Sequence, residues 1–113
     1  MVSAKTFLRL GSNLYPILDR GNSEDVRKQR YITFFGATYE VIYDLWDLIE
    51  NNLPSLRNPI HLLWTMMFLK QYNKESTNAC KCGCDEKTFR KYVWLYLKII
   101  SQLDFVSLLK TSI

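Results

Sequence analysis

Three cysteines occupy alternate positions, Cys80, Cys82 and Cys84, and are the side chains best suited to hold a metal. A structural zinc site usually takes two Cys roughly two to four residues apart and a second pair of ligands elsewhere in the chain. The only histidine, His61, could add one ligand at most. Free Cys also packs well as a small apolar residue. We therefore expect the cluster to pack at a helix end with no metal or cofactor. Because no distant Cys is available for a disulfide, a reducing intracellular compartment fits best.

Catalytic groups are not gathered anywhere in the sequence. A Cys nucleophile needs a base, usually His, and the chain has only one His. The four Gly are scattered, so no phosphate-binding loop is indicated. The 11 acidic residues include no pair that spacing singles out for acid–base work. We predict a protein that is not an enzyme and has no small-molecule substrate.

Basic side chains offer a different chemistry, because Lys and Arg bind phosphates and read guanine edges, and Thr donates to phosphate. The chain carries 15 Lys and Arg against 11 Asp and Glu, a net charge of +4. The candidates on the outward side of the predicted last helix are Lys87, Thr88, Arg90 and Lys91. Three more lysines are expected to add phosphate contacts: Lys70, Lys74 and Lys81. The alternative is an ordinary solvated helix face. The acidic Asp85 and Glu86 argue against DNA, unless they serve as helix-capping residues.

Helices must position these residues, since no segment shows the two-residue period of a strand. Residues 1–22, interrupted by Gly and Pro, are predicted to form an arm ahead of a single helical domain over 23–113. Capping residues and helical spacing predict a compact all-α bundle of about five helices. The predicted helices, each with its start signal, are 23–35 (Ser23), 39–53 (Thr38), 60–72 (Asn58 and Pro59), a short helix ending near Cys82 (Ser76 or Thr77), and 85–103 (Asp85). A tail that includes Phe105, Val106, Leu108 and Leu109 is expected to fold back on the bundle.

The order of the elements over residues 60–103 is typical of a helix-turn-helix unit of the homeobox-like kind. Such a unit needs a small residue where its two helices cross, and Ala79 fits. A glycine is expected four positions later at the turn, and Gly83 stands there. Cys84, Phe89 and Tyr92 would hold the second helix against the first. The second helix, starting at Asp85, is then the recognition helix for duplex DNA.

Two further groups are candidate contacts with a protein partner. Glu40, Asp44 and Asp47 share one side of their helix, opposite its apolar residues, so a basic partner could dock there; the alternative is a solvated face. Trp94 and Leu95 project with the lysines of the last helix rather than with its core side, and an exposed Trp is a common interface anchor. The alternative is that the C-terminal tail covers them.

Four stretches carry a resemblance: residues 34–36, 45–48, 62–70 and 85–91, which read FFG, LWDL, LLWTMMFLK and DEKTFRK. Over roughly residues 27–104 the chain resembles the N-terminal helical region of DDE-type transposases of the Harbinger-like and algal kind. That resemblance implies a helix-turn-helix that precedes a nuclease domain in the family. No nuclease domain follows in this sequence, so the resemblance implies the DNA-binding role alone, as in a domesticated fragment. The chain also resembles small DNA-binding accessory subunits of ciliate DNA adenine-N6 methyltransferase complexes, which would suit its preference for Lys, Asn, Ile, Tyr and Phe, residues with AT-rich codons.

These observations predict a non-catalytic DNA-binding protein or accessory subunit that delivers a larger DNA-acting complex to DNA, located in the nucleus. The alternative is a protein-interaction or scaffolding subunit of such a complex with little DNA affinity of its own. No apolar run approaches the ~20 residues of a membrane span, and no membrane partner is expected.

Overall fold

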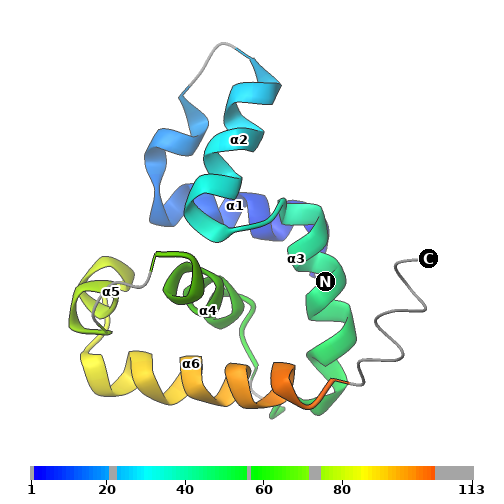
Figure 1. Ribbon diagram of the computed structural model, residues 1–113, viewed down its shortest axis with the longest axis vertical. Coiled ribbons are helices and arrows are strands. Elements are labelled where there is room, and N and C mark those ends of the chain that lie inside the picture. Colours follow the sequence, from blue (N-terminus) through cyan, green and yellow to red (C-terminus); the bar gives the residue numbers. More distant parts are fainter. Residues whose placement is uncertain (1, 21–22, 56, 72–74, 104–113) are drawn as a thin grey trace.

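Six α-helices and two short 3-10 helices make up the computed structural model, which describes residues 2–20, 23–55, 57–71 and 75–103 (Figure 1). The elements are α1 (Ala4–Leu14), η1 (Pro16–Asp19), α2 (Glu24–Phe35), α3 (Tyr39–Ile49), η2 (Glu50–Asn52), α4 (Ile60–Gln71), α5 (Glu75–Cys82) and α6 (Glu86–Ser101). No strand occurs in these ranges, so the predicted all-α bundle is confirmed. Lys74 and the predicted tail lie outside the described residues.

Helix α4 lies at the centre of the bundle, between α5 on one side and α3 on the other (Figure 1). Its side chains are apolar nearly all round, and it packs against α1, α2, α5 and α6. A helix without a polar face must be covered on all sides, which accounts for the central position of α4. Helix α6 packs against α4 and α5, and its Phe89, Val93 and Tyr96 are buried.

The predicted N-terminal arm is wrong, because residues 4–14 form helix α1 and pack into the core. Phe7 is fully buried and lies edge-on against Trp46 of α3. Gly11, which we took as a helix breaker, instead lets α1 approach the ring of Tyr31 closely. The Tyr31 hydroxyl donates to the Phe7 carbonyl at 2.9 Å and ties α2 to α1. Residues 2–20 therefore belong to the same folded unit as the rest of the described chain.

Most predicted helix starts are confirmed by their capping bonds. The Ser23 and Thr38 side chains each accept from the backbone N–H three residues ahead, at 3.2 Å. Helix α2 ends at Gly36, whose φ of 84° is the left-handed conformation that glycine adopts most readily. The predicted start of α5 is wrong, since the helix begins at Glu75 and Thr77 lies inside it.

Candidate DNA-binding face

The turn between α5 and α6 holds the small residue and the glycine whose positions were singled out in the sequence. Ala79 is buried where the two helices meet. The Cys84 N–H donates to the Ala79 carbonyl at 3.0 Å and the Gly83 N–H to the Cys80 carbonyl at 3.2 Å, which together make a Schellman C-cap. Gly83 takes a φ of 73°, where a side chain would be strained. This turn therefore sets the direction in which α6 leaves α5.

Helix α6 begins at a well-formed cap. The Asp85 carboxylate accepts from the Thr88 N–H at 2.7 Å. Hydrogen bonds from the Thr88 backbone and side chain hold the pKa of Asp85 below its usual range. Asp85 therefore acts as a capping residue, as expected of an acidic residue at a helix start. Thr88 is half-buried, and its contact with Asp85 makes it less available to a ligand than we predicted.

The solvent side of α6 carries the basic side chains that the sequence singled out. Its exposed cations are Lys87, Arg90, Lys91 and Lys98. Projected at about 100° per residue, they fall on the helix side opposite the buried Phe89 and Tyr96. Lys98 was not among our predicted DNA contacts, although its spacing of seven residues from Lys91 places it on the same side. These four cations and Trp94 are called the α6 face below.

One ion pair moderates the charge of the α6 face. Arg90 Nη2 lies 3.0 Å from Glu86 Oε1 one turn earlier, and both side chains are about half exposed. An exposed pair of this kind contributes less than about 1 kcal/mol to stability. A phosphate or guanine could therefore compete with Glu86 for the guanidinium at small cost.

Two of the other predicted phosphate-binding lysines lie elsewhere. Lys81 Nζ lies 4.5 Å from the centre of the Tyr15 ring, so it points towards the end of α1. The stem of Lys70 packs against Gly36, at the turn between α2 and α3. Lys70 follows Phe68, which contacts α6, by two residues and so projects from a different side of α4. The structure does not bring Lys70 and Lys81 together with the α6 face.

Trp94 is exposed, as predicted, and Leu95 is not. The Trp94 side chain is 52% exposed at the centre of the α6 face, and its ring meets Phe68 of α4 edge-on with centroids 6.3 Å apart. Leu95 is half-buried and packs against the core, because it projects close to the buried Ile99 one turn later. Trp94 is therefore the accessible member of the predicted pair.

Two of the three cysteines pack against the core as small apolar residues do. Cys80 is exposed, while Cys82 and Cys84 are half-buried against the core. Burial raises the pKa of the Cys82 thiol to about 12, so the thiol stays protonated at neutral pH. Across the described ranges no group of three or more His, Cys, Asp or Glu side chains could hold a metal.

His61 is buried rather than exposed. Its ring stacks on Tyr92 with centroids 3.8 Å apart and an interplanar angle of 12°. Burial lowers its pKa to about 4. His61 is thus a neutral packing residue that holds α6 to α4.

The outward side of α3 carries more than the predicted acidic stripe. Glu40, Asp44 and Asp47 are exposed as expected. Val41 and Leu48, which we assigned to the apolar side, are 54% and 45% exposed next to them. The residues of this segment that are buried in the core are 42, 46, 49 and 53. The apolar side chains extend further around the helix than the core covers, so those at the edge stay exposed. We call Glu40, Val41, Asp44, Asp47 and Leu48 the α3 face.

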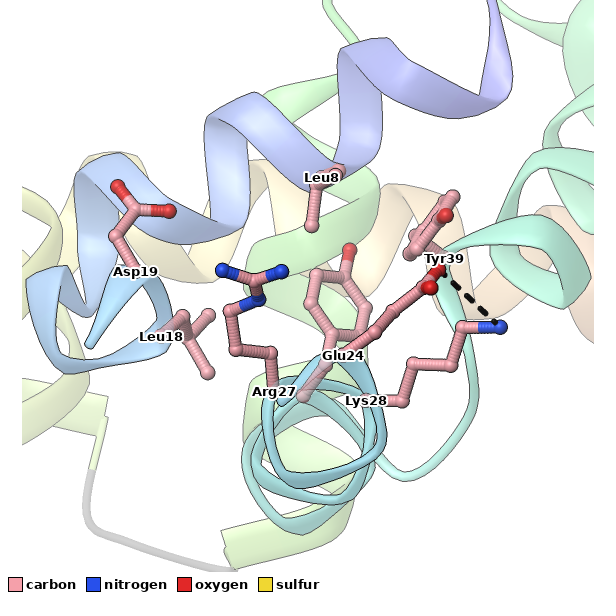
Figure 2. Close-up of a pocket in the computed structure, with 8 residues that line it drawn as sticks. Leu8, Leu18, Asp19, Glu24, Arg27, Lys28 and Tyr39 are labelled. Carbon is pink, nitrogen blue, oxygen red and sulfur yellow. Dashed lines mark ion pairs between the residues drawn. The ribbon is translucent and has the colours of Figure 1, made fainter. Parts of the chain in front are cut away.

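A pocket of about 210 Å³ opens between α1, η1 and α2, away from α6 (Figure 2). Leu8, Leu18 and Tyr31 line its apolar part, and the Arg27 guanidinium reaches across it. Its volume is below the ~300–1,000 Å³ typical of small-molecule sites. Lys28, at its rim, already pairs with Glu24 at 3.8 Å. The α6 face therefore remains the better candidate site.

Comparison of the chain with models of protein families, with characterised proteins and with solved structures finds no match. None of the helices in the described ranges combines the length and apolar character needed to cross a bilayer. The α6 and α3 faces are therefore the features of the molecule that indicate a function.

Proposed function

We propose that this chain binds duplex DNA by placing α6 in the major groove, as a non-catalytic subunit that delivers a larger DNA-acting complex to DNA. The observation that carries the proposal is the α6 face itself. Four exposed cations share one side of a helix whose start is fixed by the Gly83 turn and the Asp85 cap. A location in the nucleus and descent from a transposase belong to the same proposal.

The spacing of the α6 face supports groove binding. A homeodomain recognition helix reads bases with residues spaced i, i+3, i+4 and i+7. Lys87, Arg90, Lys91 and Trp94 have this spacing, and all four are exposed. An α-helix with its side chains is about 10–12 Å wide and fits the major groove, which is about 12 Å wide. The remaining cation, Lys98, would lie one turn further along, where the groove gives way to phosphate.

The modest charge suggests weak binding by the isolated chain. Net charge is only +4, and three of the 11 acidic residues lie on the α3 face. A few phosphate contacts give affinities in the non-specific range, with a Kd of about 10⁻⁴–10⁻⁶ M at physiological salt. A partner subunit that also binds DNA would raise the affinity through effective concentration. This is why we propose an accessory subunit and not an independent regulator.

Fluorescence anisotropy with a labelled random-sequence duplex, at several salt concentrations, tests the proposal. The test variant replaces Lys87, Arg90 and Lys91 by Ala. A matched variant removes the same charge from the other side of the molecule, with Ala at Lys5, Arg9 and Arg27, all exposed.

We expect the α6 variant to lose most of the affinity and the matched variant to lose little. Each lost phosphate contact should also lower the slope of log K against log salt by about 1. Equal losses in the two variants would show that binding depends on net charge and not on α6. Unchanged affinity in both would reject DNA binding through these residues.

The α3 face supports the second candidate, a protein-interaction subunit. Exposed Val41 and Leu48 beside three carboxylates suit an amphipathic partner helix with basic edges. Affinity purification from cells with wild-type chain and with Leu48→Asp bait compares the two candidates. A partner that is lost with Leu48→Asp, combined with no duplex binding by the wild-type chain, would favour the scaffolding function.

A further inference from the structure

Trp94 is the one large apolar side chain on the α6 face. Lys87, Arg90, Lys91 and Lys98 surround it on the helix surface, and all are exposed. Side chains of a helix lean towards its N-terminus, so the indole lies over the turn that carries Arg90 and Lys91. The edge-on contact with Phe68 holds the ring against α4. Trp94 therefore presents a fixed apolar surface among the cations.

The chemistry of the major groove limits what such a surface can contact. G·C pairs present only hydrogen-bonding groups there, whereas T adds an apolar 5-methyl group. Covering the guanine acceptors with an indole ring would leave them without partners, which costs binding energy. A methyl group against the ring costs nothing of this kind and removes apolar surface from water.

We infer that Trp94 reads a pyrimidine 5-methyl group in the major groove, an inference that rests on the proposed binding of duplex DNA by α6. Trp94 follows Lys87 by seven residues, or about 10 Å along the helix, which corresponds to about three base pairs. The preferred site then combines guanines, read by the cations, with a methylated pyrimidine about three pairs away. Thymine and 5-methylcytosine both present this group.

The experiment begins with selection of a preferred duplex from a random pool by the wild-type chain at low salt. Each thymine in the selected site is then replaced by deoxyuridine, which lacks only the methyl group. At the sensitive position, C and 5-methyl-C are compared in the same way. Wild type, Trp94→Ala and a matched control, Val26→Ala at an exposed apolar residue of α2, are titrated against all duplexes.

We expect one position where loss of the methyl weakens wild-type binding about fourfold, the factor for burying one methyl-sized group. Trp94→Ala should bind the methylated and unmethylated duplexes equally, and Val26→Ala should discriminate as wild type does. If affinity differs between T and U but not between 5-methyl-C and C, the contact is specific for thymine. If both pairs differ in affinity equally, the contact is with the methyl group alone.

Tryptophan fluorescence provides a second measurement that needs no variant. Trp46 and Trp64 are 2% and 7% exposed, so acrylamide quenching reports mainly on Trp94. Bound duplex should protect Trp94 from acrylamide.

The inference is overturned if wild type binds duplex while Trp94 stays fully quenchable, or if Trp94→Ala keeps the wild-type ratio between dT and dU. Either result would return Trp94 to the role of a protein anchor and leave the DNA proposal intact. Absence of any duplex binding would instead reject the proposed function, and this inference with it.

Discussion

Adding a single methyl group at Gly11 should destabilise the whole bundle, although it favours the helix locally. An Ala Cβ at this position would lie 2.7 Å from Tyr31 Cε2 and 3.1 Å from Phe35 Cε2. Carbon atoms pack best about 3.5–4.0 Å apart, so Tyr31 would have to move by about 1 Å. Tyr31 is buried and its hydroxyl is bonded to the Phe7 carbonyl, so the ring has little room to move.

The magnitude follows from three contributions. Overpacking of a buried position costs about 1–3 kcal/mol. Weakening the Tyr31–Phe7 hydrogen bond costs about 1 kcal/mol. Replacing Gly by Ala inside a helix returns up to about 1 kcal/mol. We therefore expect Gly11→Ala to lower the free energy of unfolding by about 1–3 kcal/mol, or the Tm by about 4–12 °C.

Urea unfolding followed by far-UV circular dichroism measures this change. Asn13→Ala is the matched control, because Asn13 is exposed on the same helix. It should gain about 0.5 kcal/mol from helix propensity alone. If Gly11→Ala is as stable as wild type or more so, α1 does not pack on Tyr31, and the N-terminal region is the peripheral arm that the sequence suggested.

Three further predictions concern α4, α5 and α6. Ala79→Leu should cost about 1–3 kcal/mol of stability, because α5 and α6 leave no room there; a wild-type Tm would contradict this. Lys87→Ala should lower the salt slope of duplex binding by about 1, and Lys5→Ala on α1 should not; equal slopes for wild type and Lys87→Ala would exclude a phosphate contact. Because burial lowers the pKa of His61 from 6.5 to about 4, the unfolded chain binds the extra proton between these values. Stability should be full above about pH 6.5 and fall by about 2–3 kcal/mol towards pH 4. Urea titrations at pH 6.5 and pH 4 should show a smaller loss of stability for His61→Phe than for wild type. Equal losses would show that His61 is not the group responsible.

Features fixed by neighbours in the sequence were predictable. The caps at Ser23, Thr38 and Asp85 depend on a side chain and a backbone N–H three residues away. The Gly83 turn depends on residues 79–84 alone. The basic side of α6 follows from helical spacing. In each case a local rule and the final fold agree, which is the condition under which sequence reasoning works.

Features fixed by distant residues were not predictable in this way. Gly11 reads as a helix breaker until Tyr31, 20 positions later, is placed against it. Lys81 was expected to contact DNA, because no residue close to it in the sequence indicates that its ammonium group lies over the ring of Tyr15. Val41 and Leu48 have core-like spacing, but α1 packs on the other part of the apolar arc of α3. A pattern can show that a side chain is apolar, whereas only tertiary packing decides which apolar residues are covered.

Helices α3 and α6 carry opposite charge, so the molecule could bind DNA with one helix and a protein with the other at the same time. Helix α3 carries Glu40, Asp44 and Asp47 and no basic residue, so phosphates would repel it while they attract α6. Helices α3 and α5 lie on opposite sides of α4 (Figure 1), and the N-terminal end of α6 lies next to α5. If that end enters the groove, the α3 face belongs to a helix on the other side of α4, and its Val41 and Leu48 are exposed. DNA binding and protein binding then use different surfaces, so a variant of one face should leave the other function intact.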